Sequence, residues 1–221
     1  MPNSPRSGGE YLFEWKQSAV QLFSLGLAVP YWAKAHFPKL PSIGRFEYKV
    51  FDPEKWRPEY PNPAFLNRLP DDEFWAAKQV MAIRDEEIRA IVRSARYSDP
   101  EAEAWLVECL IQRRDKIGRA YFRKALPIDK FEIRGGEIVF EDLSEKAGFG
   151  KAEPYAIQWF QLDNTDSSLA PIAGAKGPTL PAQGGKYRVA RISNAERLKQ
   201  IVDLTIRFDA KPVIVGIDRR W

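Results

Sequence analysis

The spacing of apolar residues divides the chain into a helical first part and a strand-rich second part. Between residues 10 and 27, apolar residues recur every three or four positions, which is typical of an amphipathic helix. Phe13 and Val20 add a second apolar side to this helix. We therefore expect other elements to cover it on both faces.

Three more helices are predicted between residues 71 and 125. Asp71 follows a proline and is a suitable N-cap for the first helix, Asp85 begins the second, and Asp99 caps the third, which has proline at its first helical position. Adjacent carboxylates at the first two helix starts would suit general acid and base chemistry. Helix capping explains them without any reaction.

A proline-rich segment lies between the first predicted helix and the other three. Eight of the 17 prolines fall between Pro30 and Pro70, and each restricts the backbone to extended or turn geometry. A short strand over residues 46–51 is the only regular element predicted there. The aromatic loop over residues 56–65 has two open interpretations: a functional loop, or a strap packed on the protein's own helices.

After Leu126 the apolar period changes from helical to alternating, so we place a boundary there between domains 1–126 and 127–221. The turn Gly135-Gly136 separates two alternating runs and predicts a hairpin in which Phe131 faces Phe140 and Ile133 faces Ile138. Further strands are predicted at residues 155–162, 187–192, 202–208 and 213–217.

The predicted fold class is therefore α+β. A helical subdomain of about four helices with a proline-rich loop precedes a small antiparallel β-sandwich, for which an immunoglobulin-like layout is one arrangement.

Composition narrows the classes of function. The 34 basic and 30 acidic residues give a net charge of +4, which is too evenly spread to predict a nucleic-acid surface. No apolar run approaches the roughly 20 residues that cross a bilayer, so we do not expect a transmembrane protein. No targeting signal is recognisable and no compartment is indicated. The Pro/Ser/Gly-rich start resembles an internal junction.

No catalytic or metal-binding set can be assigned. His36 is the only histidine and lies far in sequence from Cys109, the only cysteine, which argues against a zinc site and a histidine-dependent hydrolase. Gly184-Gly-Lys186 lacks the spacing and the hydroxyl residue of a phosphate-binding loop. Residues 163–166 offer oxygen ligands, but Asp and Asn are also common turn formers. We expect no metal and no cofactor.

Candidate binding residues fall into two groups, the aromatic loop and the basic end of the third predicted helix. The basic end is interpreted either as a phosphate or acidic-partner patch, or as a solvated face whose cations favour the negative helix end. The candidates are Trp56, Arg57, Tyr60, Asn62, Phe65, Arg113, Arg114 and Arg119.

Several motifs resemble the C-terminal portion of a family of uncharacterised bacterial proteins. They are Gly44-Arg-Phe-Glu47, Trp56-Arg-Pro58, Tyr60-Pro-Asn-Pro-Ala-Phe65, Leu69-Pro-Asp-Asp-Glu-Phe-Trp75, Arg113-Arg-Asp-Lys-Ile-Gly118 and Ile214-Val-Gly-Ile-Asp-Arg219. The resemblance implies a preceding kinase-like region, ending in an Asp-Phe-Gly-type metal-binding motif shortly before the position of Asn3. It also implies that the helices are the distal part of a kinase-like lobe. No family catalytic residue maps onto this chain.

Three hypotheses follow. The first is a non-catalytic C-terminal module that supports, or recruits ligands to, a kinase-like region outside this chain. The second is a free-standing interaction protein that binds a protein, a glycan or an anionic lipid through the Trp56 to Phe65 loop and the basic helix face. The third is an enzyme that uses Asp or Glu pairs. The expected partner is the upstream kinase-like region or another protein.

Overall fold

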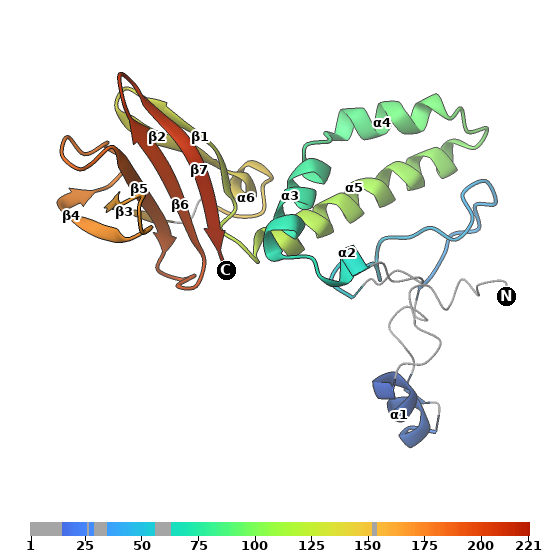
Figure 1. The fold of residues 1–221 in the computed structure, drawn as a ribbon. Helices are drawn as coiled ribbons and strands as arrows, with labels where there is room; N and C mark the ends of the chain where they lie inside the picture. Colours follow the sequence, from blue (N-terminus) through green and yellow to red (C-terminus); the bar gives the residue numbers. More distant parts are fainter. Residues whose placement is uncertain (1–14, 26, 29–34, 56–62, 152–153) are drawn as a thin grey trace. The chain divides into compact units, whose positions relative to one another are not determined.

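The computed structural model describes residues 15–25, 27–28, 35–55, 63–151 and 154–221 (Figure 1). Its helices are α1 (Trp15–Phe23), α2 (Pro63–Leu66), α3 (Pro70–Met81), α4 (Asp85–Ser94), α5 (Pro100–Phe122) and α6 (Leu143–Lys146). Its strands are β1 (Ile128–Arg134), β2 (Glu137–Asp142), β3 (Tyr155–Leu162), β4 (Leu169–Lys176), β5 (Tyr187–Asn194), β6 (Ile201–Phe208) and β7 (Pro212–Arg220). Helices thus precede antiparallel strands, and the predicted α+β class is confirmed.

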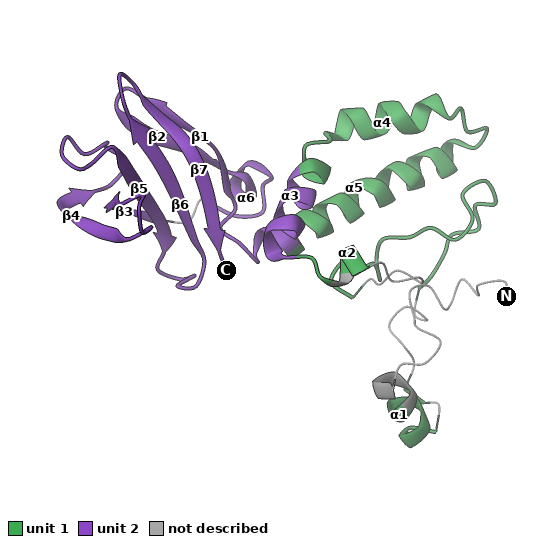
Figure 2. Cartoon of the chain, viewed as in Figure 1, with its two compact units in different colours: residues 1–68, 79–120 green, residues 69–78, 121–221 purple. Residues whose placement is uncertain are grey.

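The chain forms two compact units (Figure 2). The first contains residues 1–68 and 79–120, and the second contains residues 69–78 and 121–221. Most of α3 is therefore grouped with the strands, whereas the division predicted after Leu126 placed it with the helices.

The first unit has a small core between α4 and α5. Ile88 and Val92 of α4 pack against Val107 and Ile111 of α5. Both helices begin where the sequence predicts. The backbone N–H of Arg84 donates to Glu87 Oε2 at 2.8 Å before α4, and Asp99 Oδ1 accepts from the Glu101 N–H at 2.9 Å before α5.

Two predictions in the first unit are wrong. The described apolar side chains Val20, Leu22 and Phe23 of α1 are exposed, so α1 is not covered on both faces. Residues 46–51 form no strand. The reason is that side chains of α5, rather than a neighbouring strand, donate hydrogen bonds to the carbonyls of this segment.

The second unit contains a five-stranded antiparallel sheet in the order β4-β3-β5-β6-β7 and a separate β1-β2 hairpin. The register places Ile157 opposite Ile192, Trp159 opposite Ala190, and Ala190 opposite Leu204. Because alternate residues share a face, these side chains line one side of the sheet. Leu126, Ile128 and Ile138 complete the same core.

The hairpin has the predicted register. Ile133 pairs with Ile138, and the rings of Phe131 and Phe140 lie 5.8 Å apart. Gly135 and Gly136 have φ values of 58° and 82°, the left-handed conformation that the tight turn requires. The register shifts by one residue between Asp129 and Glu132, where Lys130 has a φ of 55°, so β1 contains a bulge near its N-terminal end.

The two-layer arrangement corresponds only loosely to the predicted sandwich, because the second layer has two named strands. The segment after β4 extends this layer: the N–H of Ile138 donates to the Pro178 carbonyl, and the N–H of Leu180 donates to the Gly136 carbonyl. The five-plus-two division differs from the four-plus-three division of an immunoglobulin constant domain.

Strands β3, β5, β6 and β7 lie within two or three residues of their predicted bounds. β4 was not predicted, because Pro171 and Gly174 favour a turn in the sequence. It lies at the edge of the sheet, where a missing N–H donor is tolerated.

The second unit also includes the start of α3. Pro70 is its first helical residue, so Asp71 is not the N-cap as predicted. Asp72 Oδ2 instead accepts from the Leu69 N–H at 2.9 Å. Phe74 and Ala77 form the buried side of the helix.

Candidate functional site

The residues predicted for the aromatic loop are only partly described. Trp56, Arg57, Tyr60 and Asn62 lie outside the described residues. Phe65 lies in α2 with 54% of its surface exposed. The loop therefore stays a prediction.

Arg113, from the predicted basic helix face, is committed to an internal contact. Its Nε donates to the Glu47 carbonyl at 2.6 Å, and its guanidinium lies 4.0 Å from the Phe46 ring centre and 4.7 Å from that of Phe51. Burial lowers the pKa of Arg113, and the charge of Glu47 opposes this shift. Arg113 thus fastens the segment 46–51 to α5.

Lys116 has the same role. Its ammonium group donates to the carbonyls of Tyr48, Lys49 and Phe51 at 2.7, 2.9 and 3.0 Å. An ammonium group has three N–H donors, so these contacts use all of them.

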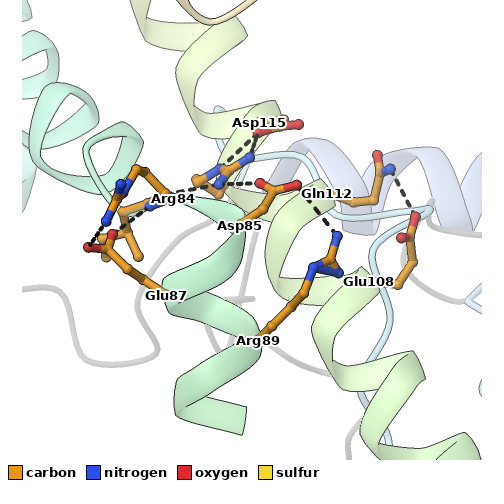
Figure 3. A network of polar contacts seen from close by, with 9 residues as sticks. Arg84, Asp85, Glu87, Arg89, Glu108, Gln112 and Asp115 are labelled. Atoms are coloured by element: carbon orange, nitrogen blue, oxygen red, sulfur yellow. Dashed lines mark hydrogen bonds and ion pairs between the residues drawn. The ribbon is translucent and has the colours of Figure 1, made fainter. Parts of the chain in front are cut away.

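Arg114 is held between α4 and α5. Its Nη1 lies 2.7 Å from Asp85 Oδ1 and its Nη2 lies 2.7 Å from Asp115 Oδ1. Figure 3 shows both carboxylates, with Arg89 reaching toward Asp85 along α4. Arg119, further along α5, is exposed. The structure therefore does not bring Arg113 and Arg114 together as an open patch.

A hollow of about 370 Å³ lies within the second unit, at the start of α3. We call it the Trp75 hollow. Its lining is Asp71, Asp72, Phe74, Trp75, Lys78, Asp129, Ile217 and Arg219.

Helix geometry brings the α3 side chains together. Asp71, Trp75 and Lys78 occupy positions i, i+4 and i+7, which share one side of a helix. Since Phe74 is buried, its neighbour Trp75 is directed away from the core and is 61% exposed.

Arg219 of β7 is a largely buried member of the lining. Only 10% of its side chain is exposed, and its guanidinium lies 4.4 Å from the centre of the Phe74 ring. Its Nη1 and Nη2 donate to the carbonyls of Leu126 and Ile128 at 3.3 and 2.8 Å. Burial lowers the pKa of Arg219, and the charges of Asp129 and Asp71 oppose this shift.

Asp129 of β1 joins the two cations. Its Oδ2 lies 2.6 Å from Lys78 Nζ, and its Oδ1 lies 3.6 Å from Arg219 Nη2. Both cations of the lining are thus engaged by a carboxylate or by carbonyls of the protein itself.

Asp71 has fewer hydrogen-bond partners than its carboxylate oxygens could accept. Its Oδ1 is buried and accepts no hydrogen bond from the described residues. Burial raises the pKa of Asp71; the charge of Arg219 opposes this, and the charges of Asp218 and Asp72 add to it. The hollow therefore holds negative charge that its own cations leave incompletely balanced.

The lining combines carboxylates and cations with an aromatic and an aliphatic surface. The eight lining residues include no histidine, cysteine, serine or threonine. Among the described residues, no group of three or more His, Cys, Asp or Glu is placed to hold a metal ion.

Sequence reasoning did not find this site. It assigned the carboxylates at the start of this helix to capping, and it gave Arg219 no role beyond a family motif. The available signal was the i, i+4, i+7 spacing of Asp71, Trp75 and Lys78 on α3. Nothing local linked these residues to Asp129 or Arg219.

Comparison with family models, with curated proteins and with solved structures found no match. In the part of the chain that the structure describes, no helix has both the length and the apolar character needed to cross a membrane.

Proposed function

We propose that this chain is a non-catalytic binding module that supports, or recruits a ligand to, a kinase-like region outside the chain. The observation that carries the proposal is the Trp75 hollow, where an exposed indole lies beside a carboxylate with one buried oxygen, and where the lining includes no histidine, cysteine, serine or threonine.

The kinase-like partner region rests on the sequence resemblance. Phosphoryl transfer needs a phosphate-binding lysine, a catalytic aspartate and carboxylates that hold magnesium. The lysine in the hollow, Lys78, pairs with Asp129 at 2.6 Å, which supports a structural role for this pair.

Titration calorimetry with ATP and MgCl₂ tests the proposal. The chain is expected to give no heat of binding up to millimolar nucleotide. Micromolar affinity for ATP, abolished by removing magnesium, would overturn the non-catalytic assignment. Circular dichroism of the same sample checks that the protein is folded.

A free-standing interaction protein is the second candidate, and the exposure of Phe65 favours it. Because Arg113 and Arg114 make internal contacts, the aromatic loop is the remaining binding surface for this candidate. A pull-down with purified Phe65→Ala and Trp75→Ala variants separates the two surfaces. If capture of a partner protein is lost in Phe65→Ala and kept in Trp75→Ala, the aromatic loop is favoured as the binding surface.

A further inference from the structure

We propose that the Trp75 hollow receives an arginine side chain from a partner polypeptide. The inference rests on the proposed binding role and adds the chemistry of the partner.

The charges of the lining favour a positively charged occupant. The lining contains three carboxylates, on Asp71, Asp72 and Asp129, and two cations, on Lys78 and Arg219. The cations are engaged by Asp129 and by the backbone carbonyls described above. An anion entering the hollow would approach Asp71 and Asp72, whereas a cation would compensate them.

The exposed walls favour a planar cation. Trp75 is 61% exposed and Ile217 is 50% exposed, so the hollow offers an indole and an aliphatic side chain beside its carboxylates. A guanidinium stacks on an indole and donates two parallel hydrogen bonds to a carboxylate. Asp72 is exposed and lies three residues before Trp75, one helical turn away on α3.

The extent of the apolar surface favours a polypeptide over a small free amine. Leu69, immediately before α3, is also exposed, so the apolar surface is not limited to the lining of the hollow. Arg and Trp are the residues most enriched at the energetic centres of protein interfaces. A neutral sugar would also stack on Trp75, and it is treated as an outcome of the test.

Peptide titration followed by NMR tests the inference on the full chain. The probe is the peptide acetyl-Gly-Arg-Gly-amide, and its control replaces arginine with citrulline, which has a similar shape and no charge. The Trp75 indole N–H signal is assigned by its loss in Trp75→Phe. The arginine peptide is expected to shift this signal and to bind about tenfold more tightly than the citrulline peptide, because only arginine is charged.

Two variants locate the contact. Trp75→Ala changes an exposed side chain and is expected to abolish binding of the arginine peptide without lowering Tm. Asp72→Asn is expected to weaken binding about tenfold through the loss of a charged acceptor. Asp166→Asn, which removes an exposed carboxylate outside the hollow, is the matched control and should leave binding unchanged.

Equal binding of the citrulline peptide would overturn the inference and would favour a neutral occupant, which a parallel titration with glucose would examine. An unmoved Trp75 signal with the arginine peptide would also overturn it. Neither result depends on ATP binding, so the failure of this inference is distinguishable from the failure of the non-catalytic assignment.

Discussion

The guanidinium of Arg219, in the last strand, donates to the backbone carbonyl of Ile128, in the first strand, at 2.8 Å. Ile128 lies at the start of β1, and Arg219 also contacts the Phe74 ring of α3. One buried side chain therefore ties β7 to β1 and to α3 within the second unit.

Replacing Arg219 with methionine is expected to destabilise the second unit by about 2–4 kcal/mol. The substitution leaves buried carbonyls without their donor and removes a charge that faces Asp129 and Asp71. Urea unfolding followed by far-UV circular dichroism measures the change. Arg134→Met, at an exposed surface pair with Glu132, is the control and should change stability by less than about 0.5 kcal/mol. Equal effects of the two variants would contradict this prediction.

Replacing Lys116 with methionine is expected to loosen residues 46–51 without unfolding α4 and α5. The variant loses three hydrogen bonds to the carbonyls of this segment, while the core between the helices keeps its contacts. Hydrogen exchange should become at least about tenfold faster in this segment, which corresponds to a loss of about 1.4 kcal/mol in local opening free energy.

Lys55→Met is the matched control for this experiment. Lys55 lies in the same part of the chain, and its side chain is largely exposed beside Asp52. Its replacement should leave exchange in residues 46–51 unchanged. Equal protection in wild type and Lys116→Met would show that the lysine does not hold the segment.

Gly136→Ala is expected to destabilise the hairpin by about 1 kcal/mol. Gly136 has a φ of 82°, and a side chain costs free energy in this left-handed region. The melting temperature should fall in consequence. Gly150→Ala is the control, because Gly150 is not in that region and an added methyl group meets nothing within 4 Å. A melting temperature unchanged in Gly136→Ala would refute the turn assignment.

Asp71→Asn is expected to raise Tm at pH 7. The pKa of Asp71 is raised above 3.8 mainly by burial, so the folded protein disfavours the charged carboxylate. Between pH 3.8 and the raised pKa, the folded state binds more protons at this site than the unfolded state, and stability at this site falls as pH rises. The increase in Tm caused by Asp71→Asn should therefore be largest above the raised pKa and should decrease as the pH falls toward 3.8.

The charges that face Asp71 are Arg219, which opposes the rise in its pKa, and Asp218 and Asp72, which add to it. Asp72→Asn is the contrasting variant, because it removes a negative charge from the first turn of α3, where the helix dipole favours one, and it should lower Tm at neutral pH. A Tm difference between Asp71→Asn and wild type that does not vary with pH would rule out titration of Asp71 as the cause.

Local signals sufficed for much of the fold. The starts of α4 and α5 follow from capping residues beside their own helices, and the β1-β2 register follows from two adjacent glycines between alternating runs. Chemistry that depends on a few neighbouring residues is readable from the chain order, and so the α+β class was predictable.

Other parts depended on contacts made at long range. The segment 46–51 has the composition of a strand, but the side chains of Trp105, Arg113 and Lys116 donate hydrogen bonds to its backbone carbonyls. The cationic character of the α5 side chains was visible in the sequence. Their commitment to internal acceptors was not, because those acceptors lie far away along the chain.

The candidate site shows the same division most clearly. The sequence by itself determined that Asp71, Trp75 and Lys78 share one side of α3, because helical spacing is a local property. Only the tertiary structure decided that Arg219 and Asp129 join them and that Trp75 is exposed beside a carboxylate with one buried oxygen. Burial and electrostatic compensation depend on which distant residues pack together, and no local pattern encodes that.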